Sequence, residues 1–209
     1  MQKKYPTREA FLLAAVEAFK PLFEKKEYKV PPVRVSTGWP HTKAVSAKSR
    51  RLAECWDNAA SEDGVNQIFI SPCLNDVTGP QGVLSILIHE VVHAVVGSKA
   101  AHGPVFKRCA QAVGLTGPMT STVAGPELLE IIASVSEELG EYPHSKLDLL
   151  KSGRKKQGTR MVKCECPSCG YTVRTTKKWL DVAAPRCPIQ GHGALHFELP
   201  EETDDSGEE

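Results

Sequence analysis

One short segment constrains the fold of this chain more than any other: residues 86–103 read ILIHEVVHAVVGSKAAHG. His89 and His93 are four residues apart, so on a helix their imidazoles project from the same face, one turn apart. Glu90 points slightly to one side, where a carboxylate can reach a water at a bound metal without being a ligand itself. This His-Glu-x-x-His pattern is typical of zinc hydrolases.

A third histidine follows at a position that suits a third ligand. Gly97 is a candidate helix stop, and His102 with Gly103 precedes a new helical pattern whose first residue is a proline. Three protein ligands leave one coordination position open, which is typical of a catalytic zinc. We therefore predict that His102 completes the site, with an acidic residue or His144 as alternatives. The apolar residues around these histidines indicate a buried helix; they are Leu84, Leu87, Ile88, Val91, Val92 and Val95. In a buried helix, His and Glu side chains are costly unless something binds them.

The surrounding pattern predicts an α+β fold, with helices beside a small, mostly antiparallel sheet. Helical spacing of apolar residues predicts helices over residues 7–25, 79–96, 104–113 and 126–139. Alternation and turn residues predict strands over residues 33–37, within 51–56 and over 66–71. Thr7 is the expected N-cap of the first helix.

The C-terminal part contains a second candidate metal site. Cys166 and Cys169 form a Cys-x-x-Cys knuckle, and Cys187 and His192 follow. This spacing predicts a zinc ribbon with one structural zinc, while a redox pair is the alternative. Four residues separate Cys187 from His192 where two are commoner, so Cys164 and His196 stay open as the fourth ligand.

A basic patch with aromatic residues lies between the two halves of this ribbon. Residues 172–180 (TVRTTKKWL) alternate as a hairpin would. Arg174, Lys177 and Lys178, beside Tyr171 and Trp179, suit phosphate contacts and base stacking, which makes DNA an expected partner. The alternative is that Trp179 fills the ribbon's own core.

Charge divides the chain further. Residues 1–145 carry 15 basic and 15 acidic residues, residues 146–200 carry 11 and 4, and residues 201–209 carry six acidic residues and none basic. We expect a neutral catalytic domain over residues 1–145, a basic linker over 146–160, the ribbon over 161–200 and a disordered acidic tail over 201–209.

Compartment and size follow from composition. The 209 residues allow one good-sized domain plus a small module. No apolar run is long enough to span a membrane, and Glu17 and Lys20 interrupt the N-terminal apolar stretch, which indicates a helix and not a signal peptide. Together with the seven cysteines, these features lead us to expect a cytoplasmic monomer that does not bind membranes.

The spacing of the first site resembles one family. His89-Glu90-x-x-His93, eight further residues, and then His102-Gly103-x-x-Phe106 are similar to the SprT-like or Spartan metallopeptidases. The resemblance extends to residues 33–39, 51–56 and 68–72 and to the C-terminal ribbon. It implies a small zincin-like domain with one catalytic zinc, Glu90 as the base, and protein substrates that are associated with DNA or crosslinked to it.

The resemblance also implies two supporting features. A strand over residues 67–71 would pair with an extended substrate, and an apolar residue, for which Met119 is a candidate, would lie beneath the metal. The alternative is a nucleic-acid-binding or transcription-associated zinc protein with a vestigial peptidase core. The intact Glu90 argues against this, because a purely structural zinc does not need it.

Overall fold

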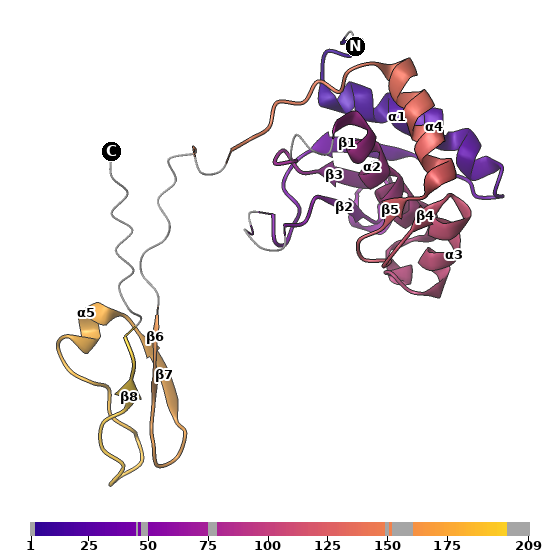
Figure 1. Cartoon of the computed structure of the whole chain (residues 1–209). Helices are drawn as coiled ribbons and strands as arrows, with labels where there is room; N and C mark the ends of the chain where they lie inside the picture. The colour runs from indigo at the N-terminus through magenta and orange to yellow at the C-terminus, as the bar shows by residue number, and fades with distance from the viewer. Residues whose placement is uncertain are drawn as a thin grey trace. The chain divides into compact units, whose positions relative to one another are not determined.

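The computed structural model describes residues 3–44, 46, 50–74, 79–148, 151 and 161–199, with the side chains of 79–81 left aside. It divides into two compact units, Met1–Ser152 and Gly153–Glu209 (Figure 1). Most of the predicted linker and all of the acidic tail lie outside the described residues. Among the described residues, no helix combines the length and the apolar character needed to cross a membrane.

A three-stranded sheet forms one layer of the first unit. Its strands are β1 (Val33–Thr37), β2 (Ala53–Trp56) and β3 (Asn66–Ile70), in the order β1-β3-β2. The strands lie where the sequence predicts them, but β1 runs parallel to β3 while β2 runs antiparallel, so this sheet is mixed. The central position of β3 corrects a second expectation: both of its edges are already paired, so residues 67–71 cannot add a substrate strand.

Helices pack beside this sheet. They are α1 (Arg8–Glu24), α2 (Gly79–Val96), α3 (Pro104–Ala112) and α4 (Pro126–Leu139). Helix α1 contacts β1 and α2 contacts β2 and β3, while α3 and α4 pack on α2. Thr7 caps α1 as predicted, since its side chain accepts a hydrogen bond from the Ala10 N–H at 3.1 Å. A short hairpin of β4 (Leu115–Thr116) and β5 (Val123–Ala124) connects α3 to α4.

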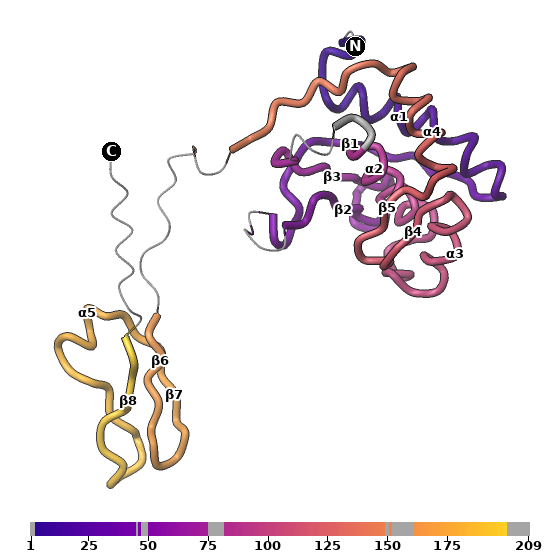
Figure 2. Tube along the Cα trace, in the orientation of Figure 1, coloured from indigo at the N-terminus to yellow at the C-terminus, as the bar shows by residue number. Residues whose placement is uncertain are grey.

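The core of the first unit surrounds α2. This helix contacts α1, α3 and α4 as well as β2 and β3, and Figure 2 shows its path among them. Leu84, Leu87, Ile88 and Val92 are fully buried. A helix that is apolar on nearly all sides is stable only in such a central position, and its polar residues are therefore held rigidly.

The second unit is a small sheet with one helical turn. Its strands β6 (Val162–Glu165), β7 (Thr172–Thr175) and β8 (His196–Phe197) lie in the order β7-β6-β8. The predicted hairpin pattern over residues 172–180 holds only for β7, which pairs antiparallel with β6; Thr176 ends the extended segment, and α5 (Lys177–Leu180) follows it. The core-filling role for Trp179 is wrong: this side chain is 60% exposed, and Leu180 is buried instead.

Candidate active site

The three predicted histidines of the first unit converge on one point. His89 and His93 project from successive turns of α2, and His102 approaches from the loop before α3. The Nε2 atom of His102 lies 3.2 Å from that of His93 and 3.3 Å from that of His89. Tetrahedral zinc with Zn–N bonds of about 2.0–2.1 Å places neighbouring nitrogens about 3.3 Å apart. The cluster could therefore hold a metal ion, and its spacing is compatible with zinc.

The alternative third ligand lies elsewhere in the same unit. His144 stacks on Tyr142, with ring centroids 5.5 Å apart, and its Nε2 atom lies 3.3 Å from the carbonyl oxygen of Leu74. It is not part of the cluster that the other three histidines form.

Phe106 forms an apolar floor beneath the cluster. Its ring is fully buried in the core of the unit. The same ring contacts all three imidazoles, at centroid distances of 5.0 Å from His89, 4.3 Å from His93 and 5.0 Å from His102. Phe106 thus has the supporting position proposed for Met119, which packs against the hydrophobic core of the unit.

Burial keeps two of the candidate ligands neutral. Desolvation, aided by the neighbouring histidines, lowers the pKa of His89 to about 4 and that of His93 to about 3. It also lowers the pKa of His102, which is more exposed. At neutral pH the buried imidazoles therefore carry no charge, and no proton competes with a metal for their lone pairs.

Glu90 is a buried carboxyl group on the same helix. Glu90 is only 6% exposed. Desolvation raises the pKa of Glu90 to about 8, against the opposing effects of Arg51 and of the Cys55 backbone N–H. A cation at the histidine cluster would favour its charged form. A buried, perturbed carboxyl beside a metal site is typical of a group that transfers protons.

Two residues outside the predicted set support the cluster. Thr122 Oγ1 lies 2.8 Å from Nδ1 of His89. Asp57 accepts hydrogen bonds from the backbone N–H groups of Ala59 at 3.0 Å and Ser98 at 2.8 Å, and so ties the end of β2 to the turn that leads to His102. The short-range bond could have been predicted from an Asp before a turn, but no local pattern indicates the two long-range contacts.

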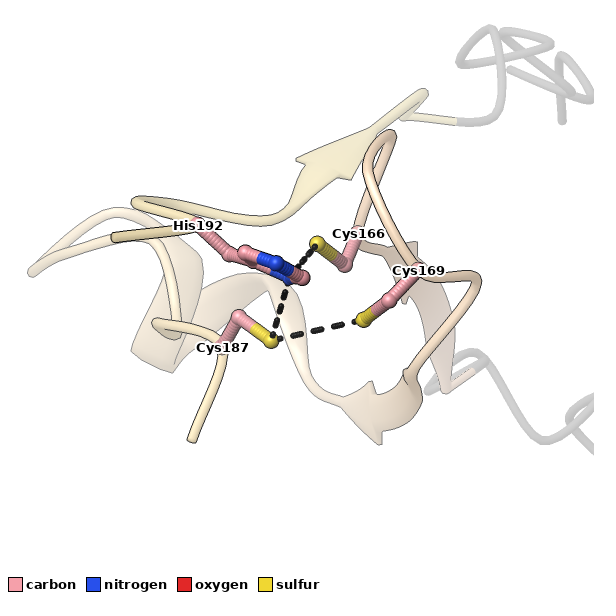
Figure 3. Close-up of side chains that lie close together, drawn as sticks. All are labelled: Cys166, Cys169, Cys187 and His192. Atoms are coloured by element: carbon pink, nitrogen blue, oxygen red, sulfur yellow. Dashed lines mark hydrogen bonds between the residues drawn. The ribbon is translucent and has the colours of Figure 1, made fainter. Parts of the chain in front are cut away.

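The second unit gathers the four predicted ribbon ligands, as Figure 3 shows. Nδ1 of His192 lies 3.7 Å from Sγ of both Cys166 and Cys187, and the Sγ atoms of Cys169 and Cys187 are 3.6 Å apart. Tetrahedral zinc with Zn–S bonds of about 2.3 Å gives separations of about 3.6–3.8 Å. This cluster is compatible with a zinc-ribbon module.

The unusual spacing between Cys187 and His192 is absorbed by a turn. Gly191 adopts a φ of +90°, and the His192 N–H donates to the Ile189 carbonyl at 3.2 Å, so the chain curls back within four residues. The alternative ligands lie outside the cluster. Cys164 is buried within β6, and His196 pairs with Glu165 across the sheet.

The environment of Cys166 favours a metal ligand. Desolvation raises the pKa of its thiol, but hydrogen bonds from the backbone N–H groups of Ser168 and Cys169 and from the thiols of Cys169 and Cys187 outweigh this effect and hold the pKa at about 6. Such N–H groups are typical of a Cys-x-x-Cys knuckle, and they favour the thiolate that binds zinc.

The first unit is thus an α+β domain with a cluster of three histidines that could hold a metal ion and a buried glutamate. The model of the SprT-like family matches residues 20–124, just over half of the chain, and these residues include all three histidines and Glu90. The chain therefore belongs to the SprT-like family, whose members are metallopeptidase-like. Neither the comparison with curated proteins nor that with solved structures found a match.

Proposed function

We propose that this protein is a zinc-dependent endopeptidase with a zincin-like catalytic domain. One observation carries the proposal: three Nε2 atoms converge at tetrahedral spacing beside a buried glutamate that follows directly on the first of them. His89, His93 and His102 would hold the catalytic zinc. Bound zinc would polarise the scissile carbonyl and lower the pKa of the attacking water.

The residues of the chain supply the remaining chemistry. The Glu90 carboxylate accepts a proton from the attacking water and delivers it to the nitrogen of the leaving amine. Its burial suits this exchange, because a raised pKa makes the proton easier to accept and hold. Phe106 fixes the three imidazoles from below and keeps water away from that side of the cluster.

The edge of β2 is our candidate for substrate pairing in place of β3. The Ser71 N–H donates to the Leu52 carbonyl at 2.8 Å, so by alternation the backbone groups of Ala53 and Cys55 face away from β3. In the described part of the chain no strand pairs with this outer edge. β2 contacts helix α2, which carries His89 and His93, and a hydrogen bond from the Cys55 backbone N–H lowers the pKa of Glu90. An extended peptide added here would lie beside the proton-transferring group.

The substitution Glu90→Gln tests the mechanism. We expect the variant to keep the fold and its zinc but to lose hydrolysis of casein, because an amide cannot accept the proton. Glu130→Gln, at an exposed position on α4, is the matched control and should cleave like the wild type. Wild-type turnover by zinc-loaded Glu90→Gln would refute the proposed mechanism.

DNA-associated proteins are our proposed substrates, with the second unit as the DNA-binding part. Trp179 is exposed, and the Lys178 ammonium lies 5.5 Å from the centroid of its ring. Arg174 is exposed on β7 opposite Lys163 of β6. Cations beside an exposed indole suit a nucleic-acid backbone and its bases. The same observation favours the second candidate, a nucleic-acid-binding protein with a vestigial peptidase core. Peptidase activity that is present in the wild type and lost in Glu90→Gln would exclude this candidate.

A further inference from the structure

The contact between Thr122 and His89 has a chemical consequence for the metal centre. Nδ1 of His89 lies 2.8 Å from Thr122 Oγ1, while its Nε2 faces Nε2 of His102 at 3.3 Å. A neutral imidazole has one N–H and one lone pair. If Nε2 is the ligand atom, the proton must sit on Nδ1, and an acceptor at Nδ1 stabilises that tautomer.

We propose that Thr122 is a positioning residue for the metal: its hydroxyl accepts the Nδ1–H of His89 and so holds the Nε2 lone pair toward the cluster. The hydroxyl also fixes the rotation of the ring, which Phe106 contacts in a tilted arrangement with the ring centroids 5.0 Å apart. The proposal rests on the zinc site of the proposed function, but it does not require hydrolysis.

The hairpin that carries Thr122 is fixed at several points. The Thr116 hydroxyl donates to the Val123 carbonyl at 3.3 Å. The Ser121 N–H donates to the Pro118 carbonyl at 2.8 Å, and the Gly125 N–H donates to the Gly114 carbonyl at 2.9 Å. The backbone therefore sets the place of the Thr122 hydroxyl.

The hairpin is also held from outside. Strand β4 packs on α3, and β5 packs on α2 and α4. The hydroxyl that orients His89 is thus anchored to the helix that carries His89, which keeps the two groups in register. Such support is what precise placement of a metal ligand requires.

His89 has no substitute for this acceptor. Within the part of the chain that the structure describes, it is the one histidine of the three whose Nδ1 meets a protein oxygen. His89 is also more buried than His102, so water is less able to replace the hydroxyl. Loss of the Thr122 hydroxyl should therefore leave the proton free to move to Nε2, where it competes with the metal.

Three substitutions separate this role from simple packing. Thr122→Val keeps the shape of the side chain and removes the acceptor, whereas Thr122→Ser keeps the acceptor and removes a methyl group. Thr120→Val is the matched control, because Thr120 is exposed on the same hairpin. We expect zinc affinity at the histidine cluster to fall by about 10–100-fold in Thr122→Val, and to stay near the wild-type value in the other two.

Zinc affinity is measured by chelator competition on the full chain in the Glu90→Gln background, so that hydrolysis plays no part. In this titration, the zinc that is absent from His89→Ala is the zinc of the histidine cluster, and the ribbon zinc serves as an internal reference. The melting temperature of the zinc-free protein provides the readout for packing. Equal zinc affinity of Thr122→Val and the wild type would overturn the proposal, as would an equal loss in Thr122→Ser.

The tautomer of His89 provides an independent test. Nitrogen-15 NMR of the zinc-free protein should show the proton on Nδ1 in the wild type and a mixture of tautomers in Thr122→Val. A wild-type His89 protonated on Nε2 would overturn the inference. If the wild-type cluster binds no zinc, the proposed function fails, and this measurement still decides the role of Thr122.

Discussion

Truncation of Phe106 should damage both the core and the metal centre. The ring is 0% exposed and lies within 4.3–5.0 Å of three imidazole centroids. Phe→Ala in a core costs about 3–5 kcal/mol through lost burial and the cavity that remains. With a urea m-value of about 2 kcal/mol per molar, the unfolding midpoint of Phe106→Ala should fall by about 1.5–2.5 M.

Circular dichroism at the helical band is the suitable assay, because among the described residues the long helices all lie in the first unit. Free zinc must be held constant, since a ligand that binds the native state adds stability by mass action. Phe106→Leu fills much of the cavity and should lose less. Val105→Ala is the control on the same helix: its side chain is 46% exposed, and we expect a change within about 0.5 kcal/mol.

The same variant should bind zinc more weakly at the histidine cluster, because the imidazoles lose the surface that orients them. Chelator competition measures this loss, with the ribbon zinc as reference. A midpoint no lower than that of Val105→Ala would refute the assignment of Phe106 to the core. Unchanged zinc affinity in a destabilised Phe106→Ala would refute its supporting role at the cluster.

Three further predictions concern His102, Asp57 and Lys178. His102→Ala should remove zinc from the histidine cluster and leave the ribbon zinc, and a metal count still at the wild-type value would place the third ligand elsewhere. Asp57→Ala should lower the free energy of unfolding by about 0.5–2 kcal/mol, because two backbone N–H groups lose their acceptor. Those hydrogen bonds lower the pKa of Asp57 below its ordinary 3.8. Its stabilisation is therefore complete above that pH and is lost as pH falls through the folded-state pKa, so wild type and variant should converge in acid. Lys178→Glu should weaken DNA binding and reduce the dependence of the affinity on salt. Lys25→Glu, at an exposed position of the first unit, is the control and should change both quantities less. Equal effects of the two substitutions would exclude a DNA site beside Trp179.

The amino-acid sequence determined the features that depend on local geometry. A four-residue spacing on an apolar helix places His89 and His93 on one face whatever surrounds them. The Cys-x-x-Cys knuckle is likewise a local turn, and the alternation of β1 and β3 follows from the pleat of a strand. These patterns predicted the helices, the strands and both groups of candidate ligands, since each pattern spans only a few residues.

The tertiary structure decided what depends on the pairing of distant segments. Strand order made β3 central and left β2 at the edge, and no single strand carries that information. The bond from Thr122 to His89 spans 33 positions, and that from Asp57 to Ser98 spans 41. Trp179 is exposed because a helical turn, in place of the predicted strand, rotated Leu180 into the core. Such contacts form only once the core fixes the relative positions of elements, because each is a single hydrogen bond or side-chain placement without a periodic signal in the sequence.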